Sequence, residues 1–167
     1  MFEKDLKVPF ESSTQVYSAD GKLLGTWNYN RENRVLVDYT KLSPALVQAL
    51  VATEDVRFYE HSGIDFYALA RAVIKRGILG QKSAGGGSTI TQKLAKKLYS
   101  EHAKTTMERV LQKPIEWVIA VKLERNYTKD EIITMYLNYF DFLHNAVGIK
   151  TASNTYFSNE PKDLTVN

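Results

Sequence analysis

Glu54 is the residue whose position in the chain most strongly suggests chemistry. It follows Val47, Leu50 and Val51 at helical spacing and so occupies a place where the pattern calls for an apolar side chain. Burial penalises a charged carboxylate, so we expect the pKa of Glu54 to be raised. A carboxyl group poised near neutral pH can transfer protons. The alternative is an ordinary glutamate at a helix end, turned to solvent.

A second kind of chemistry is suggested by the residues after a glycine-rich stretch over 80–87. Ser88 is expected to cap the next helix, whose first backbone N–H groups would be free to bind an anion. Thr89, Gln92 and Lys96 fall on a common face of that helix. The Gly-Lys-Ser/Thr order of a nucleotide-binding P-loop is absent. The pattern therefore predicts a phosphate-binding site.

Lys113 and Glu116 are a third candidate pair. They lie three residues apart and share one face of a predicted helix, with Arg109 a turn earlier. The alternative is a surface ion pair of little energetic value.

Helices should position all these residues, because caps and apolar periodicity recur along the chain. Ser43 and Pro44 start the helix that carries Glu54, and residues 61–63 break it. The other predicted elements are a hairpin over 14–29 around Asp20-Gly21, a short strand over 34–37, and helices over 65–79, 88–99, 105–125 (with Pro114 kinking or restarting it), 128–138 and 145–157. This pattern predicts a mainly α fold, with residues 1–13 as a flexible N-terminal segment.

Composition limits the possible functions. The 167 residues suit one globular domain, and the absence of cysteine excludes disulfides and thiolate metal sites. Residues 71–113 contain ten basic and two acidic residues, a net charge of +8, which leaves −5 for the rest of the chain. A basic segment favours an anionic partner. No apolar run is long enough to span a bilayer, and no signal peptide is visible.

The helix predicted after Asp65 combines aromatic and basic residues, which suits an interface with anionic lipid, although a plain amphipathic core helix fits as well. A non-catalytic basic binding module is a further alternative for the whole chain. Nucleic acid is not expected as a partner, because the aromatic-plus-basic recognition pattern is missing.

Three motifs in order resemble a known family. They read Ala52-Thr53-Glu54-Asp55-x-x-Phe58-x-x-His61-x-Gly63, then Gly86-Gly87-Ser88-Thr89-Ile90-Thr91-Gln92-x-Leu94-Ala95-Lys96, then Lys113-x-x-Glu116 followed by Leu123-Glu124-Arg125-x-Tyr127-Thr128-Lys129-x-Glu131-Ile132. Together they resemble the peptidoglycan glycosyltransferase domain of family 51, found in class A penicillin-binding proteins and monofunctional biosynthetic transglycosylases. The resemblance covers roughly Val16 to Thr165.

The resemblance implies a lysozyme-like helical domain with a head lobe and a membrane-facing jaw, over residues 14–167. It implies polymerisation of lipid II into β-1,4 glycan strands with inversion and release of undecaprenyl pyrophosphate, at the outer face of the bacterial cytoplasmic membrane. Partners would be lipid II, the growing strand and the membrane surface, with a possible fused transpeptidase domain. No cofactor is certain, and a divalent cation (Mg or Mn) is possible.

The resemblance also assigns roles to individual residues. Glu54 matches the catalytic base, and Glu116 matches a second important glutamate that positions groups or holds a cation or basic side chain near the diphosphate. Substrate binding would fall to residues of all three motifs, namely Asp55, Phe58, Ser88, Thr89, Gln92, Lys96 and Lys113. A lysozyme-like glycan hydrolase or lytic transglycosylase, with Glu54 as general acid, is the alternative enzyme.

The sequence departs from the family pattern at several places. Lys93 stands where a second glutamine is usual, and Gln112 stands where an arginine is usual. Lys93 could replace the missing charge at 112 if the two side chains converge. The glycine-rich segment expected near 142–148 reads Phe-Leu-His-Asn-Ala-Val-Gly. We expect the chain to be truncated at its C-terminus, because the family's closing motif would begin after Leu164.

Overall fold

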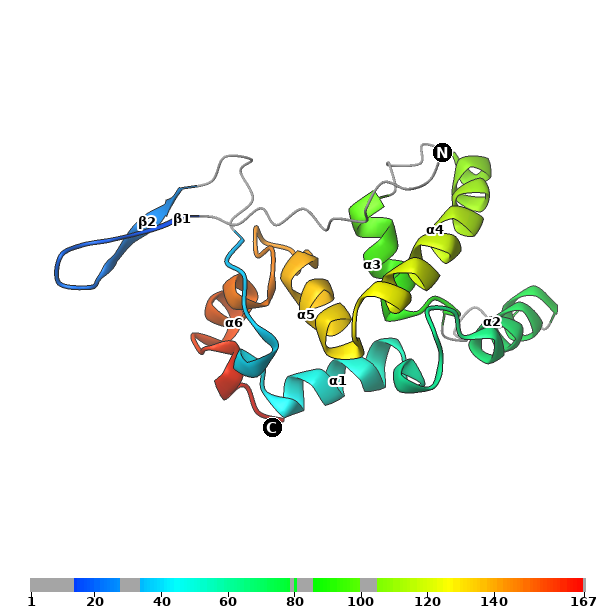
Figure 1. Cartoon of the computed structure of the whole chain (residues 1–167), viewed down its shortest axis with the longest axis horizontal. Coiled ribbons are helices and arrows are strands. Elements are labelled where there is room, and N and C mark those ends of the chain that lie inside the picture. The colour runs from blue at the N-terminus through cyan, green and yellow to red at the C-terminus, as the bar shows by residue number, and fades with distance from the viewer. Residues whose placement is uncertain (1–13, 28–33, 79, 81–85, 100–104, 167) are drawn as a thin grey trace. The chain divides into compact units, whose positions relative to one another are not determined.

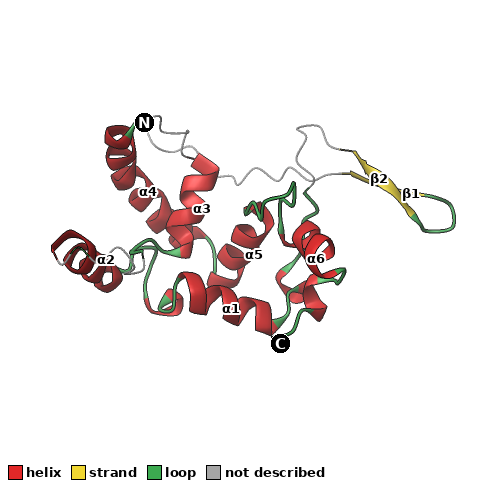
Figure 2. Cartoon of the chain, turned by 180° about the vertical axis from the view of Figure 1, so that it is seen from behind, coloured by secondary structure: helices red, strands yellow, loops and turns green. Residues whose placement is uncertain are grey.

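The structure, a computed structural model, describes residues 14–27, 34–78, 80, 86–99 and 105–166. Helices dominate it, as predicted (Figures 1 and 2). The predicted flexible segment 1–13 and most of the glycine-rich stretch lie outside the described residues. The chain forms two compact units, one comprising the residues up to Val47 together with those from Ile133 on, the other running from Gln48 to Ile132. Whether these are the expected head and jaw lobes stays a prediction.

The predicted hairpin is confirmed in the first unit. Strands β1 (Thr14–Tyr17) and β2 (Leu23–Trp27) pair antiparallel. Gly21 in the connecting turn has a φ of 81°, a left-handed conformation that favours glycine.

The strand predicted over 34–37 is wrong, because this segment pairs with a side chain rather than with another strand. The Val37 N–H donates to Asn138 Oδ1 at 3.0 Å, and the Asn138 amide donates back to the Val37 carbonyl at 2.9 Å. Asn138 therefore satisfies both backbone groups that a neighbouring strand would have used.

Helix α5 (Lys129–Tyr139) begins at the predicted Thr128–Glu131 capping box, in which Glu131 accepts from the Thr128 N–H at 2.7 Å. Its apolar side chains are buried, as expected: Ile132, Ile133, Met135, Tyr136 and Leu137.

Helix α6 (Ile149–Phe157) begins four residues later than predicted. Leu143, His144 and Asn145 have φ values of 69°, 48° and 63°, so the chain turns there before it can enter a helix. Gly148 precedes the helix with a φ of 82°, and a Cβ at this position would lie 2.8 Å from the Asn138 carbonyl oxygen. The predicted close packing around small residues is thus confirmed at Gly148.

Tyr136 makes stability sensitive to alkaline pH. Burial raises the pKa of its phenol from 10.0 to about 12. The unfolded chain ionises first, so the stabilisation is complete below pH 10 and is lost as the pH rises through 12. The loss should reach at most about 2.7 kcal/mol. Urea denaturation at pH 9–12 should show a steeper decline than in Tyr136→Phe, and parallel curves would contradict the prediction.

The second unit contains the Glu54 helix and the elements that surround it. Helix α1 (Pro44–Glu54) enters from the first unit and is capped by Ser43, whose hydroxyl accepts from the Leu46 N–H at 3.1 Å, as predicted. The 3₁₀ turn η2 (Phe58–Glu60), helix α2 (Phe66–Ala72) and the π-helical turn η3 (Val73–Ile78) follow. Asp65 caps α2, as expected, by accepting from the Ala68 N–H at 2.9 Å.

Helices α3 (Ile90–Tyr99) and α4 (Thr106–Asn126) pack side by side in this unit (Figure 1). Ala95 of α3 and Ala120 of α4 are fully buried, so each helix places a small side chain in the core of the unit. The predicted capping box of Thr105 and Glu108 starts α4. Pro114 lies inside one continuous helix, so of the two expected outcomes, a kink or a restart, the restart is wrong.

Candidate active site

Glu54 is the last residue of α1, and its carboxylate forms an ion pair with the Lys93 ammonium of α3. The two side chains are 33% and 35% exposed, so Glu54 is only partly hidden rather than placed in the core. Burial lowers the pKa of the Lys93 ammonium. The sequence marked Lys93 as a departure from the family but gave no indication that it meets Glu54.

Asp55 joins the Glu54 stretch to the start of α3. Its buried carboxylate accepts from the Ile90 N–H at 3.0 Å and lies 3.1 Å from His61 Nε2. His61 Nδ1 accepts from the Gly63 N–H at 3.2 Å, so the ring proton must be on Nε2 and is donated to Asp55. Asp55 is therefore a structural link between the first and second motifs.

The cap of α3 is Thr89, and the prediction that Ser88 would cap this helix is wrong. Thr89 Oγ1 accepts from the Gln92 N–H at 3.1 Å and donates to the Gly63 carbonyl at 2.7 Å. With Ile90 bonded to Asp55, two of the amides expected to be free for an anion already have partners inside the protein. The positive end of α3 is thus largely used to hold its own neighbours in place.

The remaining second-motif residues differ in exposure. Gln92 is buried, Ser88 is half-buried and Lys96 is exposed. Lys96 lies three residues after Lys93, so it is displaced about 4.5 Å along the helix axis from the partner of Glu54. Within the part of the chain that the structure describes, no carboxylate pairs with Lys96. Its side chain is exposed on α3.

Lys113 and Glu116 form the ion pair that their spacing predicted, with Lys113 Nζ 2.7 Å from Glu116 Oε2. The Glu116 side chain is only 3% exposed, whereas that of Lys113 is 43% exposed. A buried carboxylate thus holds an accessible lysine by its ammonium group. This arrangement fixes where Lys113 points.

A second buried ion pair was missed by the sequence reasoning. Lys129 Nζ lies 2.8 Å from Glu124 Oε2, donates to the His61 carbonyl at 2.6 Å, and sits 4.2 Å from the centre of the Phe58 ring. Thr91 Oγ1 donates to Glu124 at 2.6 Å, which ties the start of α3 to the end of α4.

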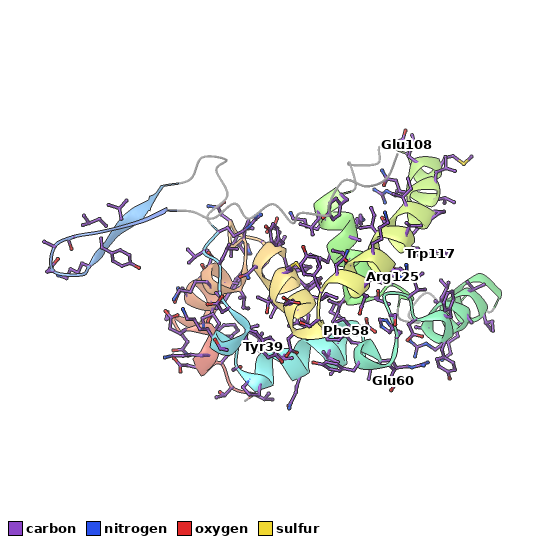
Figure 3. The ribbon with its side chains drawn as sticks, in the orientation of Figure 1. Tyr39, Phe58, Glu60, Glu108, Trp117 and Arg125 are labelled. Carbon is purple, nitrogen blue, oxygen red and sulfur yellow. The ribbon has the colours of Figure 1, made fainter. Side chains whose placement is uncertain are left out.

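Phe58, labelled in Figure 3, is fully buried and its ring packs against the Lys129 ammonium, so it contributes to the packing that holds Lys129 in place.

A signal for Glu124 did exist in the sequence. It lies four and eight residues after Ala120 and Glu116, on the same face of α4.

Gly63 is a position where an added methyl group should be costly. It has a φ of 98°, and a Cβ there would lie 2.9 Å from the backbone carbonyl atoms of Ala120. Gly63→Ala should lower the free energy of unfolding by roughly 2–4 kcal/mol, from conformational strain plus overpacking. Gly21→Ala is the matched control, because Gly21 has a φ of 81° but a methyl group added there would meet nothing within 4 Å.

Urea denaturation of both variants measures the difference between them. The control should show only the conformational part, of about 1 kcal/mol. Equal losses in the two variants would mean that the contact with Ala120 is relieved by a small shift of α4.

The α2–η3 segment carries an exposed face that combines apolar and basic residues. The exposed apolar side chains are Phe66, Tyr67, Val73 and Ile74. Arg71 and Lys75 are exposed on the same segment. Such a surface suits an interface with anionic lipid, as one sequence interpretation held.

None of the helices that the structure describes is both long and apolar enough to cross a bilayer. Nor do three or more histidine, aspartate or glutamate side chains come together among the described residues as potential metal ligands.

Comparisons with known proteins agree with the resemblance seen in the motifs. The family model described as Transglycosylase matches residues 20–167, which include every candidate site residue. Penicillin-binding protein 1F of Bacillus subtilis (strain 168) is 47% identical over 135 residues, which are 81% of this chain and 18% of that protein.

Other relatives are similar over more of the chain. Penicillin-binding protein 2D of the same organism is 40% identical over 158 residues, 95% of this chain and 22% of that protein. Penicillin-binding protein 1A of Escherichia coli (strain K12) is 37% identical over 153 residues, 92% of this chain and 17% of that protein. The chain spans about a fifth of the length of these curated relatives. It belongs to the transglycosylase family, the peptidoglycan glycosyltransferases that its three motifs indicated.

Proposed function

We propose that this chain polymerises lipid II into β-1,4 glycan strands, with Glu54 as the general base. The observation that carries the proposal is the position of Glu54 within a transglycosylase domain. Glu54 is a partly exposed carboxylate that forms an ion pair with Lys93 of α3, and the same helix carries the exposed Lys96.

The proposed reaction is an inverting displacement. The Glu54 carboxylate takes the proton of the 4-hydroxyl of one disaccharide as that oxygen bonds to the anomeric carbon of another. The bond from the anomeric carbon to the diphosphate oxygen breaks, and undecaprenyl pyrophosphate departs with the electron pair. Because attack and departure occur on opposite faces of the sugar, base and cations must serve opposite faces too.

Lys96 and Lys113 are the groups that we assign to the departing diphosphate. Lys96 is exposed, and the Lys113 ammonium is accessible while its position is fixed by Glu116. Preorganised cations of this kind stabilise charge that develops in the transition state. Ser88 can add a hydroxyl donor, whereas Asp55, Thr89 and Phe58 would act by holding the site together.

Glu116 fits one of its two expected roles better than the other. Its carboxylate already holds a basic side chain, Lys113. A magnesium ion typically uses one or two carboxylates together with substrate phosphates. A divalent cation at this site would therefore depend chiefly on the oxygens of the diphosphate itself.

We propose that the domain works at the outer face of the bacterial cytoplasmic membrane, with the exposed α2–η3 face against the lipid. The apolar and basic side chains of that face support this placement. The matched relatives are several times longer than this chain and are named for binding penicillin. A fused transpeptidase domain in the parent protein is proposed on that ground.

Incubation with lipid II tests the function directly. Labelled lipid II should yield long strands and free undecaprenyl pyrophosphate, and lysozyme should digest the strands because their linkage is β-1,4. A hydrolase or lytic enzyme would instead shorten purified glycan strands and leave lipid II intact. That second result would overturn the proposal in favour of the alternative enzyme.

A further inference from the structure

The Glu54–Lys93 pair is supported by a neighbouring hydrogen bond as well as by charge. Asp55, the residue after Glu54, bonds the Ile90 N–H at 3.0 Å, and Lys93 lies one turn further along α3. The Lys93 N–H bonds the Thr89 carbonyl at 3.1 Å, within the capped first turn. The end of α1 and the first turn of α3 are therefore joined by two neighbouring contacts, Asp55 with Ile90 and Glu54 with Lys93. The first contact helps to hold the Glu54 and Lys93 side chains together.

The charges around Glu54 disfavour its ionised form unless a cation lies nearby. A carboxylate at the last residue of α1 faces the negative end of the helix dipole, and Asp55 adds a second carboxylate beside it. Several other described charged groups of this unit already have partners: Asp55 with His61, Glu124 with Lys129, Glu116 with Lys113, and Arg57 with Glu60 and Asp65. Lys96 and Lys97 are exposed. Among the described residues, Lys93 is the cation that contacts Glu54.

We infer that Lys93 is a positioning residue for the candidate base, holding the Glu54 carboxylate ionised and aimed so that it works at lower pH than it would alone. The inference rests on the proposed function of Glu54. A neighbouring cation favours the charged form of a carboxylate. The cation lowers the proton affinity of the carboxylate, which makes it a weaker base. It also increases the fraction of molecules in which Glu54 is ionised and can accept a proton.

The same contact would help the site to reset. Once Glu54 has taken the hydroxyl proton, the adjacent ammonium disfavours the protonated acid, so the proton leaves through the exposed third of the side chain to water. Burial lowers the pKa of the Lys93 ammonium, so Lys93 should lose its proton, and with it the ion pair, at a lower pH than a free lysine would.

The pH dependence of kcat/KM for lipid II polymerisation tests this inference. In Lys93→Gln the acid limb should move up by roughly one pH unit, while Lys93→Arg should keep the original limb because it restores the cation. Lys97→Gln, which removes an exposed charge from the same helix, is the matched control and should leave the limb unchanged. Thermal melts should first show that all three variants are folded. An unchanged acid limb in Lys93→Gln would overturn the inference.

A second measurement separates this inference from the proposed function. Carbon-13 NMR of labelled glutamate, assigned with Glu54→Gln, follows protonation of Glu54 without any substrate. If the Glu54 midpoint rises in Lys93→Gln together with the acid limb, the inference stands. If the midpoint does not move, Lys93 does not act on Glu54 and the inference fails, whatever Glu54 does. If the midpoint moves but the acid limb does not, the proposed role of Glu54 as the base of polymerisation fails, and the inference fails with it.

Discussion

Glu54→Gln should reduce the rate of glycan polymerisation by about 10²–10⁴-fold, because glutamine cannot take the proton of the attacking hydroxyl. The substitution keeps the shape of the side chain and a carbonyl oxygen that can accept from Lys93. We therefore expect kcat to fall while the KM for lipid II and the thermal midpoint change little. Strand formation from labelled lipid II, measured on a polyacrylamide gel, gives the rate.

Glu60→Gln is the matched control for this experiment. Glu60 lies close in sequence, its side chain is 63% exposed, and it pairs with Arg57 rather than with a residue of the site. Its polymerisation rate should equal that of the unaltered chain. Glu54→Gln protein that is folded and still forms strands at the normal rate would remove Glu54 from the role of base.

Lys129→Met should lower the free energy of unfolding by about 3–5 kcal/mol, because it leaves the Glu124 carboxylate buried without its cation. The Glu124 side chain is 5% exposed, so solvent cannot replace the lost ammonium. The substitution also removes the hydrogen bond to the His61 carbonyl and the contact with the Phe58 ring. Urea denaturation followed by circular dichroism measures the loss.

The double variant Glu124→Gln/Lys129→Met distinguishes the orphaned charge from the lost contacts. A glutamine at 124 removes the charge but still accepts from Thr91, so stability should recover by more than half. If the double variant is no more stable than Lys129→Met, the cost comes from the Phe58 and His61 contacts instead.

The sequence predicted features that depend on neighbouring residues. The caps at Ser43, Asp65, Thr105 and Thr128 were all predicted correctly, since a cap bonds amides only two or three residues away. The Lys113–Glu116 pair was predicted for the same reason. Family membership followed from long motifs in the right order.

Features set by distant parts of the chain could not be predicted. Lys93 and Glu54 are 39 residues apart, and their contact depends on how α3 docks against the end of α1. Ser88 was the predicted cap of α3, whereas the hydroxyl that caps it belongs to Thr89, which also donates to the distant Gly63 carbonyl. Likewise, the 34–37 segment was predicted to be a strand because no neighbouring residue indicates that its backbone bonds to the Asn138 side chain, which is 101 residues away.

The bond from Asp55 to the Ile90 amide has a consequence for engineering. A chimaera with a relative could be made by exchanging one motif at a time. Here an exchanged 86–99 segment must still offer an amide at position 90 to Asp55 and a suitable side chain at position 93 to Glu54. The first two motifs therefore make up a single cassette, and we expect hybrids that divide it to lose folding and turnover together.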